Sequence, residues 1–275
     1  MGNAYWQHPD FDPVIIHLWG PLQIRWYSLL YVGAFLVARV ILKRLAREQR
    51  FKFTEDDMEQ FIVWSLLGAV VGARIIYCLV YDPAGLMSDP LYLFKVYQGG
   101  LSFHGGLLGV IVAAVIFSHT KKIPFWNLAD AMALCCPPGL AMGRLGNFIN
   151  AELYGRVTNV PWAMVFPHAG AEPRHPSQLY ELFLEGILLC AVLWFLKSRV
   201  RRDGVLAMVF LFGYTLARFI VEFFRQPDSH IGFLLFGLSM GQWLSVVMLV
   251  ASVVTAVILS RRPVPEETKK KKKKK

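Results

Sequence analysis

The stretch Val205–Phe224, which reads VLAMVFLFGYTLARFIVEFF, decides the fold class of this chain. A helix of about 20 mostly apolar residues is long enough to cross the hydrocarbon core of a bilayer. Comparable apolar stretches occur at Ile24–Leu42, Phe61–Val80, Leu101–Phe117, Leu128–Met142, Leu179–Leu196 and Met240–Leu259. We therefore expect an all-α integral membrane protein with about seven transmembrane helices. The stretch Leu128–Met142 contains Pro137 and Pro138, which predict a kink.

The composition agrees with a membrane protein and argues against nucleic-acid binding. Only 17% of the 275 residues are charged, whereas soluble domains typically have about 25%. The net charge of +10 comes from short runs between apolar stretches and from the terminal run Lys269–Lys275, and not from one basic face. Cys78, Cys135, Cys136 and Cys190 lie in apolar stretches without metal-ligand spacing, so we interpret them as small hydrophobic residues.

Lysine and arginine residues alternate between the predicted loops. The loops after the first, third and fifth predicted spans and the C-terminal tail are basic, whereas the segment before Ile24 has no Lys or Arg. Basic loops stay on the cytoplasmic side, so we expect the N-terminus outside and the C-terminus inside. We expect one membrane domain over residues 1–262, with a small extracytoplasmic cap at about 144–178. A disordered basic tail follows at 263–275, and no cleavable signal peptide is expected.

The stretch Gly143–Gly155, GRLGNFINAELYG, places an arginine, two asparagines and a glutamate at the end of an apolar segment. Polar and ionisable groups at membrane depth are costly, so such a cluster indicates a functional site. The alternative is a helix-end loop whose polar groups are only solvated.

Tyr214, Arg218, Glu222 and Arg225 are spaced by four, four and three residues, so they share one helical face. Two arginines beside one carboxylate leave surplus positive charge, which favours an anionic ligand. The planar guanidinium group suits bidentate binding of phosphate. The alternative is a structural ion pair in which Glu222 only fixes helix packing.

His104, Gly105 and Gly106 begin another predicted span. Glycine leaves backbone N–H groups open to close approach, and a helix N-terminus attracts anions. His104 is a candidate general base, with a hydrogen-bonded structural role as the alternative.

Ser177 resembles an N-cap residue, and Glu181 and Glu185 follow it on one helical face. We interpret these two carboxylates as structural counter-charges for Arg144 or Arg74. Tyr27 lies at the outer end of its span, where it either lines a site or belongs to the interfacial aromatic belt.

The ordered set of motifs resembles the prolipoprotein diacylglyceryl transferase family. Gly143–Gly155 is similar to the signature of that family, and supporting stretches are Phe11–Val14, Trp26–Tyr27, His104–Gly106, Arg174–Glu181 and Arg218–Asp228. The likeness covers nearly the whole chain except the lysine tail. Ala151 stands where glycine is common in the family.

The resemblance implies seven spans in the bacterial inner membrane and an active site open to the outer face. It implies transfer of a diacylglyceryl group from phosphatidylglycerol to the lipobox cysteine thiol of a preprolipoprotein signal peptide, with release of glycerol phosphate. These two substrates are the expected partners, and neither a cofactor nor a metal is implied.

Matched residue by residue, the resemblance implies a catalytic set of Arg144, Arg218, His104 and Tyr27. In that set Arg144 and Arg218 are expected to bind the headgroup and stabilise the leaving phosphate, and Glu222 and Arg225 are expected to hold Arg218 in place. The expected substrate-binding residues are Arg144, Asn147, Asn150, Glu152, Gly155, Gly105, Gly106, Arg218, Glu222 and Arg225.

Two other classes of protein share part of this pattern. A transporter or channel for an anionic lipid or solute also carries intramembrane arginines, but it predicts an inverted repeat. A structural membrane protein also uses ion pairs, but it predicts that loss of Arg144 destabilises the fold.

Overall fold

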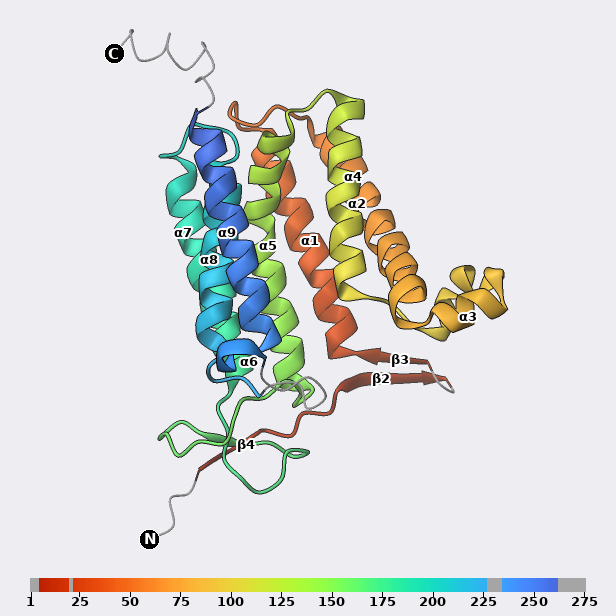
Figure 1. The fold of residues 1–275 in the computed structure, drawn as a ribbon, viewed down its shortest axis with the longest axis vertical. Coiled ribbons are helices and arrows are strands. Elements are labelled where there is room, and N and C mark those ends of the chain that lie inside the picture. Colours follow the sequence, from red (N-terminus) through yellow and green to blue (C-terminus); the bar gives the residue numbers. More distant parts are fainter. Residues whose placement is uncertain (1–4, 20–21, 227–233, 262–275) are drawn as a thin grey trace. The chain divides into compact units, whose positions relative to one another are not determined.

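The computed structural model describes residues 5–19, 22–226 and 234–261, and in this part of the chain the fold is mostly helical (Figure 1). The predicted basic tail and the Pro227-Asp228 end of the last motif lie outside the described residues. The chain divides into two compact units, residues 1–38 with 132–275 and residues 39–131. Two long helices, α1 (Trp26–Ala46) and α5 (Phe125–Ile149), contribute to both units.

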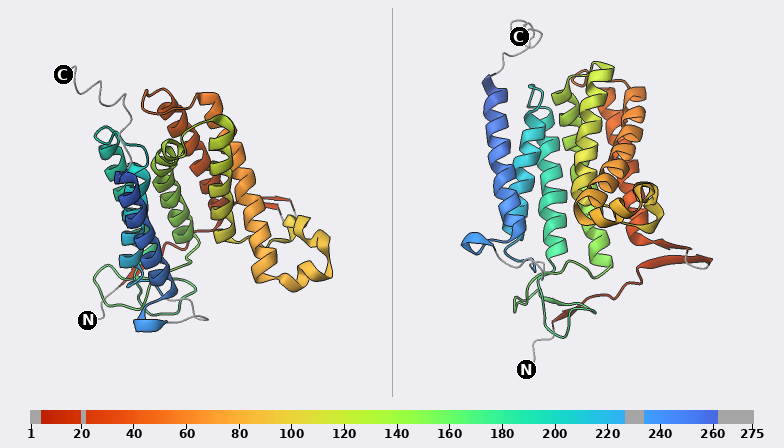
Figure 2. Two further views of the ribbon diagram at one scale, coloured as in Figure 1. Left: turned by 45° about the horizontal axis from the view of Figure 1, so that its top comes forward. Right: turned by 45° about the vertical axis from the view of Figure 1, so that its right-hand side comes forward.

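The first unit contains a continuous helical rod made of α6 (Ser177–Glu181), the π-helix η4 (Leu182–Leu188) and α7 (Leu189–Lys197). Helices α8 (Val205–Val221) and α9 (Met240–Arg261) lie side by side (Figures 1 and 2), and the short 3-10 helix η5 (Leu235–Gly237) precedes α9. Helix α8 packs against α9, α7, η4 and α6.

The second unit is built on α2 (Glu55–Ile76) and α4 (Phe103–Lys121). Thr54 and Asp57 form a capping box that begins α2. The two helices approach closely because glycines face each other, and a Cβ atom at Gly72 would lie 2.4 Å from the carbonyl oxygen of Gly105. The connection between them holds η1 (Tyr77–Tyr81), α3 (Pro83–Ser88), η2 (Pro90–Phe94) and η3 (Val96–Gln98).

The expectation of a multi-pass helical membrane protein is confirmed. Each predicted apolar stretch falls on a helix, although some boundaries shift by a few residues. Helices long and apolar enough to cross a membrane are Glu55–Tyr81, Phe103–Lys121, Ser177–Lys197 and Met240–Arg261, and Val205–Val221 is a shorter apolar helix. Helix α5 stays helical through Pro137 and Pro138.

The boundary of the cap differs from the prediction at its start. Helix α5 continues to Ile149, so Arg144 and Asn147 stand on its last turns, and the loop that was expected to begin at Arg144 begins after them. The loop contains β4 (Met164–Val165), which pairs in parallel with β1 (Trp6–Gln7). The cap is therefore joined to the N-terminal segment of the chain.

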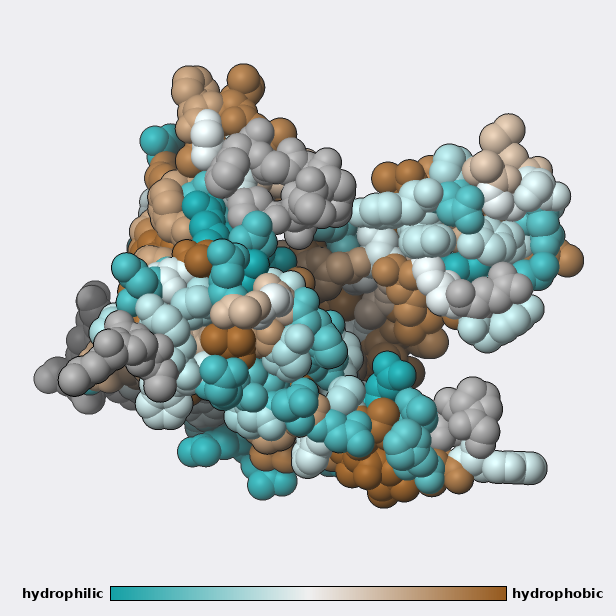
Figure 3. All heavy atoms as spheres, turned by 90° about the horizontal axis from the view of Figure 1, so that it is seen from below, coloured by the Kyte–Doolittle hydropathy of each residue, from teal (hydrophilic) through white to brown (hydrophobic). Residues whose placement is uncertain are grey.

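A second pair of short strands lies outside the helices and was not expected from the sequence. Strands β2 (Val14–Trp19) and β3 (Leu22–Arg25) form an antiparallel hairpin that leads into α1. Figure 3 shows the molecule from below the view of Figure 1, which is the end where β4 lies. On this face hydrophilic side chains are interspersed with hydrophobic ones.

Candidate active site

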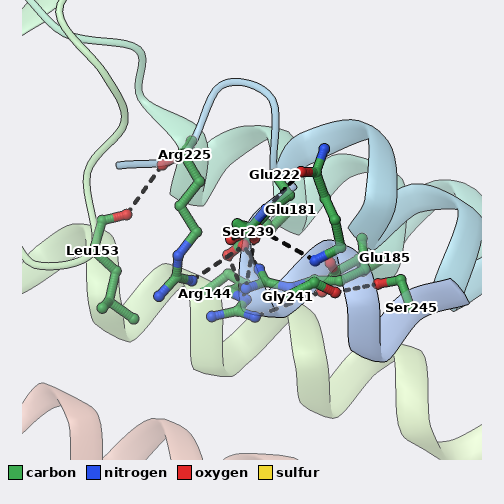
Figure 4. Close-up of polar contacts among 12 residues, drawn as sticks. Arg144, Leu153, Glu181, Glu185, Glu222, Arg225, Ser239, Gly241 and Ser245 are labelled. Atoms are coloured by element: carbon green, nitrogen blue, oxygen red, sulfur yellow. Dashed lines mark hydrogen bonds and ion pairs between the residues drawn. The ribbon is translucent and has the colours of Figure 1, made fainter. Parts of the chain in front are cut away.

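The carboxylate of Glu181 lies among three arginines of the first unit. The Nε atom of Arg144, on the last turns of α5, is 2.7 Å from Oε2 of Glu181. Arg218 of α8 donates through Nη1 to Oε1 of the same carboxylate, and Nη1 of Arg225 lies 3.5 Å from that oxygen. Figure 4 shows Arg144 and Arg225 directing their guanidinium groups toward this point. Arg144 is far from Arg218 and Arg225 in the sequence, and the fold brings all three to one carboxylate.

Two more glutamates complete this group, which we call the arginine–carboxylate cluster (Arg144, Arg218, Arg225, Glu181, Glu185 and Glu222). Oε2 of Glu222 lies 3.0 Å from Nη2 of Arg218, so the expectation that Glu222 holds Arg218 agrees with the geometry. Arg225 approaches Glu181 instead of holding Arg218 directly. The side chains of Arg144 and Arg218 are 17% exposed, whereas those of Glu181 and Glu185 are at most 1% exposed. The arginine side chains are therefore more exposed than the carboxylates that they contact.

Two residues at the start of α9 contact the carboxylate of Glu222. The hydroxyl of Ser239 donates to Oε1 of Glu222 at 2.9 Å, and Gly241 leaves room for this carboxylate, which lies 2.8 Å from where a Cβ atom would stand. Ser239 also forms a capping box with Gln242, because the backbone N–H of each residue donates to the side chain of the other. One residue thus both starts a helix and orients the carboxylate that holds Arg218.

A second network surrounds Arg144. Nη1 of Arg144 lies 3.5 Å from Oδ1 of Asn147, and Asn147 donates to Oε1 of Glu152 at 2.8 Å. Asn150 donates to the same oxygen at 3.3 Å. The ring of Tyr27 lies against Gly146, where a Cβ atom would be 2.8 Å from Cδ2 of the tyrosine. The structure therefore brings Tyr27 and the polar residues of the Gly143–Gly155 motif to the same region.

Gly155 positions the backbone near Arg225. The backbone of Gly155 forms a bridge with Arg225, and a Cβ atom at position 155 would lie 2.5 Å from the carbonyl oxygen of Phe224. The next residue, Arg156, donates to the carbonyl oxygen of Arg225 at 2.8 Å. In the same part of the cap, burial and the charge of Arg156 lower the pKa of His175. The absence of a side chain at Gly155 allows the cap to hold the segment that carries Arg225.

His104, Gly105 and Gly106 stand at the start of α4, in the second unit. The backbone N–H groups of the two glycines were expected to be open to an anion. Instead, the N–H of Gly105 donates to Oγ of Ser102 at 3.3 Å, and the N–H of Gly106 donates to the carbonyl oxygen of Ser102 at 2.9 Å. Glycine is required at position 105 because α2 approaches closely there, and a Cβ atom would lie 2.4 Å from the carbonyl oxygen of Gly72. His104 is exposed, and its role as a base stays a prediction.

The comparisons with known proteins agree with one another. The family described as prolipoprotein diacylglyceryl transferase matches residues 13–258. The chain belongs to this family. It is 47% identical to phosphatidylglycerol–prolipoprotein diacylglyceryl transferase of Idiomarina loihiensis, over 93% of this chain and 96% of the relative. Enzymes of the same name from Bordetella bronchiseptica and Geobacter sulfurreducens are 49% and 48% identical, each over 94% of this chain and over 98% and 99% of their own lengths.

Membership of this family decides among the three classes that the sequence left open. The chain is a diacylglyceryl transferase, and neither the transporter nor the purely structural alternative is supported. The expected enzyme class is confirmed.

Several details of the site differ from the sequence prediction. Ser177 is not an N-cap, because it is the first residue of α6 and its hydroxyl donates to the carbonyl oxygen of Leu153 at 3.0 Å. Glu181 and Glu185 are counter-charges of Arg144, as one alternative had it, whereas Arg74 donates to backbone carbonyl oxygens of the second unit. The contribution of Ser239 was missed, although the sequence Ser239-x-x-Gln242 before an apolar run is a signal for a capping box.

Proposed function

We propose that this chain transfers the diacylglyceryl group of phosphatidylglycerol to the lipobox cysteine thiol of preprolipoproteins and releases glycerol phosphate. The names of the relatives support the two substrate classes. The observation that supports the proposed site is that Arg144 and Arg218 contact the two oxygens of one carboxylate, that of Glu181. Two guanidinium groups that share a carboxylate are close enough to share a phosphate, which is also a compact anion with several acceptor oxygens.

The chemistry requires a group that stabilises negative charge. The sulfur of the cysteine attacks the glycerol carbon that bears the phosphate, an S–C bond forms and the C–O bond to phosphate breaks. The bonding electron pair leaves with the phosphate oxygen, and the thiol proton balances the additional negative charge. Positioned arginines lower the barrier because the charge on that oxygen is larger in the transition state than in the bound lipid.

The proposed roles follow from the positions of the side chains. Arg144 and Arg218 exchange part of their contact with Glu181 for contact with the phosphate, and Glu222 with Ser239 keeps Arg218 oriented. Asn147, Asn150 and Glu152 shape the site beside Arg144, and Tyr27 lines it. A thiol with a free pKa of about 8.5 is mostly protonated at neutral pH, so its proton needs an acceptor. His104 is the acceptor proposed from the sequence.

We further propose that α1, α5 and α8 cross the membrane together with the four candidate spans Glu55–Tyr81, Phe103–Lys121, Ser177–Lys197 and Met240–Arg261, which gives seven spans. The arrangement of basic loops supports a periplasmic N-terminus and cap and a cytoplasmic C-terminus in the bacterial inner membrane.

The test uses purified full-length protein in detergent micelles with phosphatidylglycerol labelled in its acyl chains and a lipobox peptide. We expect the label to appear on the peptide through a thioether bond, with one glycerol phosphate released for each peptide modified. A peptide with serine in place of the lipobox cysteine is the matched control and should remain unlabelled. Absence of labelled peptide with folded protein would reject the proposed reaction.

The proposed base has its own test. A general base accepts a proton only in its deprotonated form, so the rate of the wild-type protein should rise with pH until the base is deprotonated. His104→Gln should lose this rise and require a higher pH for the same rate. An unchanged profile in the variant would assign the proton to another group.

A further inference from the structure

Glu185 differs from the other carboxylates of the arginine–carboxylate cluster in its contacts. It lies on the π-helix η4, its side chain is 0% exposed, and neither of its oxygens has a hydrogen bond from the described residues. The closest ion pair joins its Oε2 to Nη2 of Arg144 at 3.7 Å. Glu181 and Glu222, by comparison, each have an arginine nitrogen within 3.0 Å.

The fold places Glu185 where water is excluded. The following residue, Gly186, lies against α5, and a Cβ atom there would be 2.6 Å from Cβ of Ala141. This close approach brings Glu185 beside Arg144, which stands one turn further along α5. An ionised carboxylate in such a place costs several kcal/mol unless strong partners compensate for the lost hydration. A protonated carboxyl avoids most of that cost.

The charges that face Glu185 come from every element around it. Glu181 precedes it on α6, Arg144 faces it from α5, and Tyr214, Arg218 and Arg225 face it from α8 and the turn after it. With all groups ionised, the three arginines of the cluster balance the carboxylates of Glu181, Glu185 and Glu222, which gives no net charge. A phosphodiester would then add a negative charge to a neutral cluster. A neutral Glu185 leaves one positive charge, which the phosphodiester balances.

We propose that Glu185 is ionised while the arginines hold no lipid, where it completes the neutral cluster, and that it takes up a proton when the anionic phosphate of the lipid occupies the arginines. This inference rests on the proposed phosphate site. Glu185 is a positioning residue in this scheme, since it acts on the lipid through the charge of its surroundings and through Arg144. Where the free protein has an ionised Glu185 and the bound protein a protonated one, the dissociation constant rises by about tenfold for each unit of pH.

Calorimetry of binding in two buffers with different ionisation enthalpies counts the protons taken up. The probe is dihexanoyl phosphatidylglycerol added to the full-length protein in non-ionic detergent, and the titration is repeated at several pH values because uptake is largest where the free protein has an ionised Glu185 and the bound protein a protonated one. We expect the wild-type protein to take up close to one proton per lipid. Glu185→Gln imitates the neutral side chain, so it should bind the lipid with no proton uptake and with a dissociation constant that does not change with pH.

Asp130→Asn is the matched control, because Asp130 is also a fully buried carboxylate paired with an arginine, and lies in the second unit. It should take up protons like the wild type. Binding by the wild type without proton uptake would overturn the proposal, and this result does not depend on whether the variant folds. Equal uptake by Glu185→Gln, or its failure to bind as a folded protein, would also overturn it.

Arg144→Lys separates this inference from the proposed function. If the wild type binds the lipid without proton uptake and Arg144→Lys loses binding, the phosphate site stands and only the role of Glu185 fails. If Arg144→Lys binds as well as the wild type, the phosphate site itself is wrong.

Discussion

Two kinds of arginine occur on the helices of this protein. Arg74 of α2 is 3% exposed, and its guanidinium donates only to backbone carbonyl oxygens in the part of the chain that the structure describes, those of Tyr92, Leu93, Gly99 and Gly100. It also lies over the ring of Tyr92, 4.5 Å from the centroid. Arg144 and Arg218 instead contact carboxylates, and their side chains are 17% exposed.

The difference separates a structural arginine from one that can bind a ligand. Carbonyl oxygens of a folded loop cannot leave the guanidinium of Arg74 without unfolding that loop. Carboxylate side chains can be exchanged for another anion, because the incoming anion restores the lost contacts. The chemical nature of the groups that an arginine contacts therefore indicates its role better than its exposed fraction does.

The largest effect is expected at the exchangeable arginines. Arg144→Ala or Arg218→Ala should lower kcat/KM for diacylglyceryl transfer by about 100-fold or more, because each removes a charge-assisted contact of about 2–3 kcal/mol in the transition state. The measurement is the rate of peptide labelling per folded protein. Arg39→Ala removes an exposed arginine paired with Glu59 and serves as control. A variant at either site with a normal rate would remove the basis of the comparison.

Arg74→Lys should show the opposite pattern. A lysine cannot reach the several carbonyl oxygens that the guanidinium bridges, so unfolding should require about 2 kcal/mol less. The rate per folded molecule should change far less than in Arg144→Ala. Thermal unfolding in detergent combined with the labelling assay measures both quantities. A large loss of rate with unchanged stability would place Arg74 among the ligand-binding arginines.

Two glycines sharpen the comparison further. Gly155→Ala and Gly72→Ala each introduce a Cβ atom within 2.5 Å of a carbonyl oxygen, and each should cost about 1–3 kcal/mol of stability. Only Gly155→Ala should also lower kcat/KM, by roughly tenfold, since it displaces the backbone next to Arg225. Equal loss of rate in both variants would show that the effect follows general destabilisation.

The smallest effect is expected at Ala151. Its φ of 53° lies in the left-handed region, which favours glycine. Glycine would relieve about 1–2 kcal/mol of backbone strain, but it would also lose a buried methyl group and gain freedom in the unfolded chain, which together offset most of that gain. Ala151→Gly should change the unfolding free energy by less than about 1 kcal/mol and leave the rate unchanged. A shift beyond about 2 kcal/mol in chemical denaturation would contradict this estimate.

Periodicity and hydropathy predicted the helices well, because long apolar stretches carry a strong signal. Boundaries were less accurate at α5, where polar residues continue the helix to Ile149. The hairpin of β2 and β3 escaped prediction because its residues adjoin a long apolar span and give no separate pattern.

The polar members of the site were predictable from their cost at membrane depth, which made Arg144 and Arg218 candidates at once. Glu181 was expected as a counter-charge of Arg144 or Arg74, but spacing along the chain did not show that Arg218 contacts the same carboxylate. The prediction of free N–H groups at Gly105 and Gly106 was wrong because Ser102 accepts a hydrogen bond from each of them.

The pairing of β1 with β4 has a consequence for how the protein is made. His8 contacts the carbonyl oxygen of Phe148, 140 positions later in the chain, and Trp6 pairs with Met164. During synthesis the amino-terminal segment therefore has no access to these partners until helices α1 to α5 and the loop after them have been synthesised. A nascent chain that stops before β4 leaves the aromatic ring of Phe148 without Phe166, so the hydrophobic cluster at the end of α5 is completed only after the loop that contains β4 has been synthesised.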